Sequence, residues 1–545
     1  GVGAICVISA GFGEAGAEGR ALERALLEKV RTAGCRLIGP NCMGLLNTDP
    51  AVRLNATFSP VYPPAGGVAM STQSGALGLA ILDYAKQLNI GISSFVSVGN
   101  KVDVSGNDLI QYWAEDQQTS VILLYLESFG NPRKFSEIAR RVARVKPIVA
   151  VKAGRSTAGA RAAASHTGAL ASSDTVVDAL FGQSGVIRTD TLEELFNVAA
   201  LLAHQPVPRG RRVAILTNAG GPAILAADAC EANGLELAVL SEATQSELRA
   251  FLPAAASVTN PVDMIASATP AHYRRALAAL LRDEQVDSVV VIFIPPLVTE
   301  PDAVAAEIVA AAQTAAGKPI LAVFMRAGGA PQVLSSIPSY AFPESAAIAL
   351  ARVTAYGEWK QKPAGTTPAL TGVQPERAKA VVAAALQRGG GWLTPAETNE
   401  LMIAAGIRTA AVRVASTVAQ AVDAAASVGF PVALKAIGPT LLHKTERQAV
   451  RLNLGTREAV HEAATDFERR FGGEQTGFVV QEMVSGGVEM LVGALEDPTF
   501  GPVVVCGSGG ILVDLLADSA FRMHPLTAED AAEMIDELKG ARLLR

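Results

Sequence analysis

The chain has 545 residues, of which 50% are hydrophobic and 18% are charged, and its formal net charge is −6. This length and apolar content predict three or four domains with cores of their own and exclude a disordered chain. The mild negative charge argues against a dedicated nucleic-acid-binding protein.

The five cysteines are scattered along the chain and form no Cys-x-x-Cys pair. This pattern argues against a disulfide framework and a structural zinc site, so a cytoplasmic location is the simplest expectation. No apolar run approaches the ~20 residues of a membrane helix. Residues 4–9 are apolar but lack the basic leader of a signal peptide. Because the chain begins at Gly1 and stops at Arg545 directly after a helical pattern, we expect a fragment cut at both ends.

The first segment, residues 1–60, predicts a strand at 4–9, a helix at 19–32 and a strand at 36–39. This order is typical of the end of a Rossmann-like domain. Residues 11–16, Gly-Phe-Gly-Glu-Ala-Gly, formally match the dinucleotide fingerprint. However, Glu14 would place a carboxylate in the phosphate cradle, and no acidic residue ends the next strand to bind a ribose hydroxyl. A Rossmann dehydrogenase is therefore disfavoured.

The next two segments, residues 61–208 and 209–362, resemble each other. Each opens with an apolar strand, a Gly-containing turn and a helix, and continues with an Asn-x-x-Asp, a buried strand, a Lys-Pro and a closing helix. The matched positions are Gly67–Ser71 and Arg212–Leu216, Asn100–Asp103 and Asn260–Asp263, and Lys146-Pro147 and Lys318-Pro319. We expect an α/β protein with two doubly wound, flavodoxin-like domains of one topology.

Ser74-Gly75 and Gly220-Gly221 follow the first strand of each repeat and precede a helix. Small residues at this point let backbone N–H groups and the helix dipole meet an anion. Each turn alone is more often an ordinary tight connection between a strand and a helix. As a matched pair, they predict two helix N-termini that face one phosphoryl group.

His166 lies in a Gly- and Ala-rich loop, residues 158–172, that the first repeat has and the second lacks. Loops at the carboxyl edge of a parallel sheet are where ligands bind. A lone histidine is more often structural or exposed, but a neutral imidazole is also a competent nucleophile toward phosphorus. Glu127 ends a buried strand at the same edge and is the candidate that fixes the imidazole tautomer; otherwise it is a capping or surface acid.

Residues 363–385 are polar and contain proline, which predicts a linker, and residues 386–545 predict a strand-rich α+β domain. Lys435 lies inside an apolar strand, where its ammonium needs a partner. That partner is either a nucleotide phosphate or a carboxylate in a salt bridge. Glu482 and Val484 end another strand, where a nucleotide base or ribose could bind, and Glu489 follows in the next strand.

Several motifs are similar to those of the NDP-forming acyl-CoA synthetases, which include the ADP-forming acetate–CoA ligases and are related to succinyl-CoA synthetase. The motifs are Gly39-Pro-Asn-Cys-Met-Gly44, Gln73-Ser-Gly-Ala-Leu-Gly78, Leu124-Tyr-Leu-Glu127, Ser165-His-Thr-Gly-Ala169, Asn218-Ala-Gly-Gly-Pro222, Asn260-Pro-Val-Asp263 and Leu442-His-Lys-Thr445. The resemblance covers nearly the whole chain. It implies a CoA-binding domain, two ligase domains and an incomplete ATP-grasp domain.

The resemblance also implies roles for individual residues. His166 would be phosphorylated and steadied by Glu127, and in some members of the family a second histidine, here His443, relays the phosphoryl group. Asn41 and Gly44 would bind CoA or substrate. Four residues would contact the nucleotide: Lys435, Glu482, Val484 and Glu489. Its cofactors would be Mg²⁺, ATP/ADP and coenzyme A.

Some positions depart from the family pattern. Gln448-Ala449 stand where the family usually has a Gly-Gly pair, and their side chains could hinder the approach to phosphates. Asp514, a candidate metal ligand, stands where a glutamate is common. The glycine-rich start of the CoA-binding domain and the late Asn-Pro segment that helps to hold Mg²⁺ are absent, which fits the expected truncation.

We therefore expect an acid–thiol ligase that interconverts acyl-CoA, ADP and phosphate with a carboxylate, CoA and ATP. Its acid would be acetate or another small or aryl carboxylic acid, and the protein would form a homodimer without nucleic-acid or membrane partners. The alternative is a non-ligase module that senses acyl-CoA or nucleotide within a protein lysine acetyltransferase. Gln448-Ala449 favour the alternative, whereas His166 and Glu127 favour the ligase.

Overall fold

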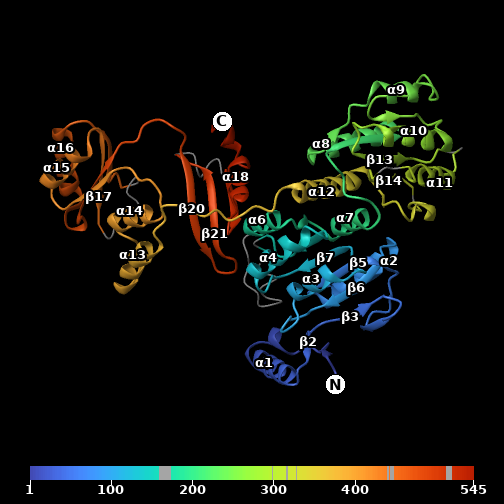
Figure 1. Ribbon diagram of the computed structural model, residues 1–545, viewed down its shortest axis with the longest axis horizontal. Coiled ribbons are helices and arrows are strands. Elements are labelled where there is room, and N and C mark those ends of the chain that lie inside the picture. The colour runs from blue at the N-terminus through green and yellow to red at the C-terminus, as the bar shows by residue number, and fades with distance from the viewer. Residues whose placement is uncertain are drawn as a thin grey trace. The chain divides into compact units, whose positions relative to one another are not determined.

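The computed structural model describes residues 1–544 except 157, 159–173, 297–298, 315–316, 327, 439–440, 442–446 and 511–517. It divides into two compact units (Figure 1). The large unit contains residues 1–365, 491–508 and 512–541, and the small unit contains residues 366–490, 509–511 and 542–545. Across the described residues, no helix is both long and apolar enough to cross a bilayer.

The first sheet of the large unit is mainly parallel, and its central strands are buried almost end to end, as expected for a sheet covered on both faces. Its strands are β3 (Gly44–Asn47), β4 (Leu54–Thr57), β5 (Ala65–Thr72), β6 (Ile92–Ser97), β7 (Val121–Leu126), β8 (Ile148–Lys152) and β9 (Ile187–Thr189). Their order is β4-β3-β6-β5-β7-β8-β9. Since β3 pairs antiparallel with β6, this sheet begins earlier in the chain than the expected boundary after residue 60.

The second parallel sheet has the same central order, β11-β10-β13-β14-β15, with β12 also paired to β10. Its strands are β10 (Arg212–Thr217), β11 (Glu236–Leu237), β12 (Val262–Asp263), β13 (Ser288–Phe293), β14 (Ile320–Phe324) and β15 (Ser339–Tyr340). Because β11 and β12 pair with the start and the end of β10 on the side away from β13, together they take the place of one strand. Counted in this way from β5 and from β10, both orders are 2-1-3-4-5, the flavodoxin-like order. The prediction of two doubly wound domains of one topology is confirmed.

One expected correspondence between the repeats is wrong. Asp263 pairs with Thr217 at the end of the first strand of its sheet, and the residue that pairs with the matching Thr72 is Ser97. Asp103 instead lies beyond β6, where its carboxylate accepts hydrogen bonds from Arg31, Arg36 and the backbone of Leu37. The two Asn-x-x-Asp segments therefore have the same sequence pattern but lie at different positions in the two sheets.

Helices connect the strands of the large unit. They are α1 (Ala17–Thr32), α2 (Gly75–Gln87), α3 (Gly106–Glu115), α4 (Pro132–Ala143), α6 (Asp174–Ser184), α7 (Leu192–His204), α8 (Gly220–Ala232), α9 (Glu242–Arg249), α10 (Pro270–Arg282), α11 (Pro301–Ala312) and α12 (Pro343–Gln361). At the N-terminus, β1 (Ala4–Cys6) and β2 (Arg36–Ile38) pair in parallel around α1. This is the strand–helix–strand order that the sequence predicts for residues 1–60.

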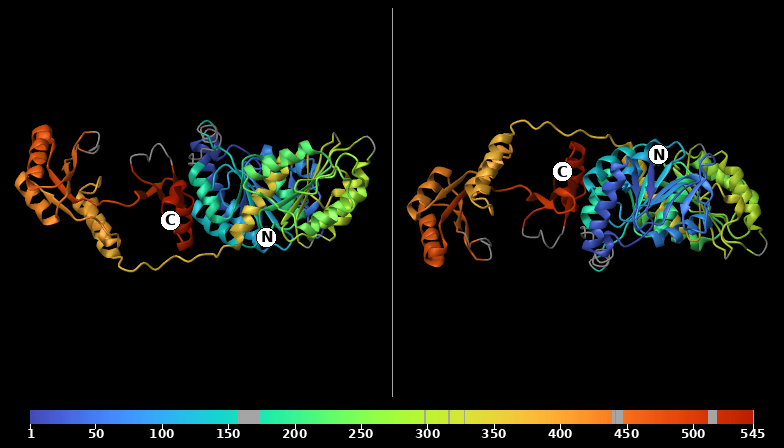
Figure 2. Two further views of the ribbon diagram at one scale, coloured as in Figure 1. Left: turned by 90° about the horizontal axis from the view of Figure 1, so that it is seen from above. Right: turned by 90° about the horizontal axis from the view of Figure 1, so that it is seen from below.

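The small unit has a four-stranded sheet with the order β16-β19-β17-β18, and α15 and α16 pack side by side on it (Figure 1). Its elements are α13 (Pro375–Gln387), α14 (Pro395–Ala404), β16 (Val412–Ala415), α15 (Val418–Val428), β17 (Val432–Ile437), β18 (Val450–Leu454), α16 (Arg457–Phe471) and β19 (Gly477–Glu482). The linker expected at 363–385 is in part wrong. Its second half belongs to α13, an Ala-rich helix with proline at its start, and only the stretch before α13 is extended (Figure 2).

A three-stranded sheet follows, and most of it belongs to the large unit. It contains β20 (Met490–Asp497), β21 (Gly501–Ser508) and β22 (Ser519–Met523), and α18 (Ala528–Asp536) follows it. The side-chain amide of buried Gln183 in α6 donates to the Met523 carbonyl at 3.1 Å and accepts from the Met523 N–H at 2.9 Å. Phe500, also buried, contacts Phe129 edge to face, with ring centroids 5.6 Å apart.

Candidate active site at the carboxyl edge of the first sheet

The turn after β5 is closed by local hydrogen bonds that aim helix α2 at the carboxyl edge of the sheet. The hydroxyl of Thr72 donates to the Ser74 carbonyl at 3.0 Å and accepts from the Ser74 N–H at 3.2 Å. The Ser74 hydroxyl then caps α2 by accepting from the Leu77 N–H at 3.4 Å. The N-terminus of a 13-residue helix, with the partial positive charge of its dipole, therefore starts at Gly75.

The second repeat builds the same turn after β10. The hydroxyl of Thr217 donates to the Ala219 carbonyl and accepts from the Ala219 N–H, both at 3.0 Å. Helix α8 starts at Gly220, and its N-cap Ala219 has no side-chain oxygen to occupy the free N–H groups. A methyl group on Gly220 would lie 3.3 Å from the Asp263 carboxylate. The two predicted cradles are thus built alike, one in each repeat.

Glu127 follows β7, directly beside the turn that holds Ser74. The Gln73 side-chain oxygen accepts from the N–H groups of Glu127 at 2.8 Å and Ser128 at 2.9 Å, and its nitrogen donates to the Ser128 carbonyl at 2.6 Å. The Lys101 ammonium donates to the same carbonyl at 2.8 Å and to the Ser128 hydroxyl. The backbone that carries the predicted orienting acid is therefore fixed from two sides.

Lys152, the last residue of β8, is only 6% exposed and donates from Nζ to the Ala153 carbonyl at 2.5 Å. Burial lowers its pKa, and Arg188 adds to this, while the carboxylates of Asp174 and Glu127 act in the opposite direction. It lines a cleft of about 650 Å³ together with Tyr125 and Arg155. The sequence analysis missed both Lys101 and Lys152. A lysine inside an apolar strand was the available signal for Lys152, as it was for Lys435.

Ion pairs at the rim of this cleft join the two ends of the segment 159–173. Arg155, before the segment, contacts Asp190 at 2.5 Å and Asp174 at 3.5 Å. Asp174, after the segment, also contacts Arg188 at 2.6 Å. His166 itself lies outside the described residues, as do His443 and Asp514.

The predicted CoA segment lies against the start of α2. A methyl group on Gly75 would contact the Met43 N–H nitrogen at 3.5 Å, and that N–H donates to the Ser97 hydroxyl at 3.0 Å. The Asn41 side chain donates to Asn100 at 3.3 Å. Gly44 has φ +108°, and a methyl group there would lie 2.0 Å from the Ala56 carbonyl oxygen, so only glycine fits. The structure thus brings Asn41–Gly44 together with Ser74-Gly75.

The glycine-rich turn at residues 11–16 is filled by its own side chain. The Glu14 carboxylate accepts from the N–H groups of Gly11 at 2.6 Å and Phe12 at 3.2 Å, and from the Asn100 amide at 2.6 Å. Although burial acts to raise the pKa of Glu14, these hydrogen bonds lower it below its usual value. The N–H groups that a dinucleotide phosphate would need already have an anion, which argues further against a dehydrogenase.

In the small unit, the Lys435 ammonium donates to the Gln481 side-chain oxygen at 2.6 Å. Glu482, on the neighbouring strand β19, accepts from the Ala411 N–H at 3.1 Å, and Val484 is 71% exposed. The carbonyl of Glu489 accepts from the Gly509 N–H at 2.7 Å. These four predicted nucleotide contacts therefore share one unit, but no direct contact joins Lys435 to Glu482 among the interactions described.

Gln448 and Ala449 differ in how they bear on a nucleotide site. Gln448 has φ +54°, a left-handed conformation that favours the glycine expected there from the family. Ala449 is fully buried in the core of the small unit. Its methyl group therefore packs inward, so only Gln448 presents an exposed side chain where the family usually has glycine.

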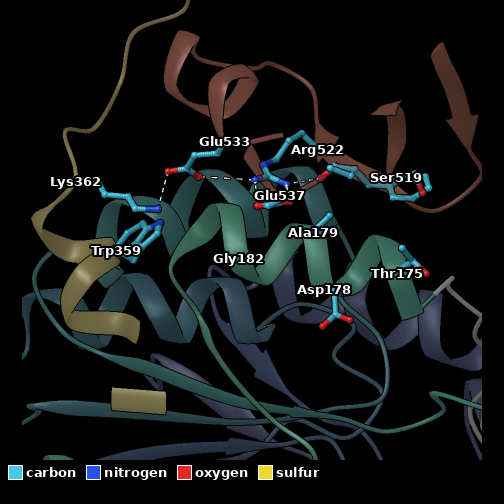
Figure 3. Close-up of a pocket in the computed structure, with 12 residues that line it drawn as sticks. Thr175, Asp178, Ala179, Gly182, Trp359, Lys362, Ser519, Arg522, Glu533 and Glu537 are labelled. Carbon is cyan, nitrogen blue, oxygen red and sulfur yellow. Dashed lines mark hydrogen bonds and ion pairs between the residues drawn. The ribbon is translucent and has the colours of Figure 1, made fainter. Parts of the chain in front are cut away.

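A second cavity of about 370 Å³ lies between α6, the end of α12 and the last sheet of the large unit (Figure 3). Its charged groups are paired, since Lys362 contacts Glu533 at 2.7 Å and Arg522 contacts Glu537. None of the predicted site residues that the structure describes lines this cavity. Elsewhere in the described chain, no three His, Cys, Asp or Glu side chains are grouped closely enough to hold a metal ion.

Three family models match consecutive parts of the chain. They are the succinyl-CoA ligase like flavodoxin domain at residues 65–202, the Ligase-CoA domain at 213–362 and the ATP-grasp domain at 384–545. Together they cover most of the sequence, in the order that the motifs predict.

Full-length relatives show the same likeness. The chain is 40% identical to an acetate–CoA ligase (ADP-forming) of Archaeoglobus fulgidus, over 99% of this chain and 78% of that protein. It is 33% identical to a 4-hydroxybutyrate–CoA ligase (ADP-forming) of Nitrosopumilus maritimus, over 99% and 79%. A solved structure, the dinucleotide forming acetyl-coenzyme A synthetase 1 of Ca. Korarchaeum cryptofilum in complex with phosphate and ADP, matches 66% of this chain and 78% of its own, with a TM-score of 0.63 and 37% identity.

Proposed function

The chain belongs to the ADP-forming acyl-CoA synthetases, and we propose on this premise that it interconverts acyl-CoA, ADP and phosphate with a carboxylate, CoA and ATP through a phosphohistidine. The observation that carries the proposal is Glu127, held by Gln73 at the carboxyl edge beside the N-terminus of α2. A carboxylate at this position suits a histidine partner, from which it can accept a hydrogen bond. It would repel a free phosphate ion bound at the same place.

Phosphate would first attack the thioester to form an acyl phosphate, and His166 would then take the phosphoryl group. Glu127 would fix the imidazole tautomer so that the attacking nitrogen keeps its lone pair. The helix N-termini that start at Gly75 and Gly220 would stabilise the charge of the transferred group. Splitting the transfer into two steps lets distant sites share one phosphoryl group without releasing it to water.

The nucleotide would bind with Lys435, Glu482, Val484 and Glu489 around it, and His443 would relay the phosphoryl group. Bound Mg²⁺ would neutralise charge on the nucleotide phosphates. Mg²⁺ usually takes one or two carboxylates besides phosphates and water, so the described acids need not form a cluster. Glu489, one of the predicted nucleotide contacts, would be one carboxylate available for this role. Asp514 is the other candidate.

The acid is acetate or another small or aryl acid, since the relatives named above differ in this respect. CoA would bind along Asn41–Gly44, next to the first cradle. We expect the protein to act as a homodimer in the cytoplasm, without a nucleic-acid or membrane partner. Light scattering of the purified chain measures the oligomer directly.

The proposal predicts that incubation with Mg·ATP adds one phosphoryl group to His166, and that a carboxylate together with CoA removes it. Intact mass measured at neutral pH detects the adduct, because phosphohistidine is lost in acid. His166→Ala should reduce exchange between ATP and ADP by at least about 10³-fold. His461→Ala, which removes an exposed histidine on α16, is the matched control.

Exchange that persists in His166→Ala would contradict the phosphohistidine mechanism. A chain that binds CoA but never forms the adduct would instead support the alternative, a sensory module of a protein lysine acetyltransferase. In that case Gln448 is the first residue to change, since it alone presents an exposed side chain where the family has glycine.

A further inference from the structure

The two repeats share one topology. A strand-by-strand comparison therefore shows which side chains occur only in the first repeat, which holds the candidate active site. Thr72 pairs with Tyr125 in the first sheet, and Thr217 pairs with Ile292 in the second. Two residues farther along, Glu127 therefore matches Ile294.

The same register extends to the next strand. Leu126 pairs with Lys152, and the matching Phe293 pairs with Phe324. The first repeat thus has a carboxylate and an ammonium where the second has Ile294 and Phe324. Phe324 is 2% exposed and Lys152 is 6% exposed, so the charge replaces an apolar side chain in an equally buried position. A buried ammonium is costly unless it meets an opposite charge, which indicates a function for it.

Lys101 reaches the residue next to Glu127 from the loop after β6. Its ammonium donates to the carbonyl and the hydroxyl of Ser128, the residue next to Glu127. The charged groups that act on Lys101 are the carboxylate of Glu127 and the ammonium of Lys152. One carboxylate and two ammonium groups that interact with it have a net positive charge, which suits the arrival of a phosphoryl group.

We propose that Lys101 and Lys152 are positioning residues for Glu127: Lys101 fixes the backbone of the adjacent Ser128, and both ammonium groups offset the charge of the Glu127 carboxylate, so that a phosphohistidine can form beside it. This inference rests on the proposed function. It assigns no contact with the substrate to either lysine, and it makes Glu127 the residue through which both act.

The test compares Lys101→Met and Lys152→Met with Lys146→Met in the full chain. Lys146 is the matched control because its ammonium also donates to two carbonyls, those of Trp113 at 2.7 Å and Asp116 at 2.6 Å, at the opposite edge of the same sheet. With Mg·ATP, the first two variants should form the phosphoenzyme about 10- to 100-fold more slowly than the wild type, as expected for a misplaced catalytic group. Lys146→Met should form it at the wild-type rate.

A second measurement separates positioning from mere loss of stability. In a Glu127→Gln background, removing either lysine should cause little further slowing, because both act through the residue already lost. Lys101→Arg and Lys152→Arg should recover most of the rate, since arginine keeps the charge. Equal slowing by Lys101→Met with and without Glu127 would overturn the inference.

The pH profile gives a third readout. Burial lowers the pKa of Lys101 to about 8, assisted by Lys152 and opposed by Glu127. Phosphoenzyme formation by the wild type should therefore fall as the pH rises through about 8, because the ammonium loses its proton. Lys101→Arg should move this fall to higher pH. Identical profiles would contradict the assignment.

The outcomes distinguish the inference from the function on which it rests. If the wild type forms phosphoenzyme and Lys101→Met and Lys152→Met match Lys146→Met, the positioning role fails alone. If the wild type forms none, the proposed function fails, and the positioning role fails with it.

Discussion

The thiols of Cys6 and Cys42 lie 3.7 Å apart, beside the segment proposed to bind CoA. The hydrogen bond from Cys42 lowers the pKa of Cys6 to about 7, against the effect of burial, whereas burial raises the pKa of Cys230 to about 12. Because the thiolate is the nucleophile, Cys6 should be alkylated by iodoacetamide far faster than Cys230 at pH 7.5. Peptide mass spectrometry across a pH series should give a midpoint near 7 for Cys6.

Replacing Cys42 tests whether its hydrogen bond lowers the pKa of Cys6. Cys42→Ala should move the midpoint for Cys6 upward, since the thiolate then loses its hydrogen-bond donor. An unchanged midpoint, or one already in the ordinary range for a thiol, would contradict the pairing.

Gln448 offers a second prediction for a single residue. A left-handed conformation costs a residue with a Cβ roughly 1–2 kcal/mol, and glycine avoids most of this cost. Gln448→Gly should therefore stabilise the small unit by about 1 kcal/mol, measured by denaturant unfolding. Gln420→Gly, inside helix α15, should do the opposite, because glycine weakens a helix interior. A loss of stability in Gln448→Gly would show that its side chain is needed.

Among the elements, the strand pair β3–β4 depends on one glycine. Gly44 and Gly11 both have positive φ, +108° and +99°, but only Gly44 lies against another backbone. Gly11→Ala should cost roughly 1–2 kcal/mol from conformation alone. Gly44→Ala should cost several kcal/mol, because the added methyl group would lie 2.0 Å from the Ala56 oxygen. If Gly11→Ala and Gly44→Ala had the same melting temperature, the close contact between residue 44 and the Ala56 oxygen would be excluded.

Strand periodicity was enough to predict most elements of the parallel sheets. The buried strands β7 and β13 coincide with largely uninterrupted apolar runs, which leave little choice of structure. The short strands β16 and β22 were missed. The four residues of β16 include Arg413, and those of β22 include Arg522, so neither shows an apolar run. Their pairing with β19 and β21 decides their structure instead.

Sequence alone predicted a site residue only where its type and its position directly after a strand already indicate a function. Glu127 and Ser74 could be placed at the carboxyl edge because each follows a recognisable strand. Lys101 could not, because its role depends on hydrogen bonds to Ser128, which is distant in sequence. The supposed match of Asp103 with Asp263 failed for a related reason: identical letters at equal spacing do not show which residues pair across a sheet.

At the scale of the whole molecule, a buried aromatic contact attaches the last sheet to the first parallel domain. Phe500 is fully buried against Phe129, and Phe342 is 59% exposed. Phe500→Ala should destabilise the large unit by about 3–5 kcal/mol and make residues 491–541 susceptible to proteolysis. Phe342→Ala, the matched control, should change little. Similar unfolding of both variants would argue that the last sheet contributes nothing to the large unit.

The large unit is also discontinuous in sequence, since residues 366–490 separate its two main parts. During translation, the first parallel domain is complete long before residues 491–541 leave the ribosome. Domains fold as they emerge, so Phe129, which contacts Phe135 and Phe181 edge to face, lacks its partner Phe500 while the small unit is made. The ring of Phe129 is open to other chains for that interval, and the large unit is complete only when the sheet that carries Phe500 covers it.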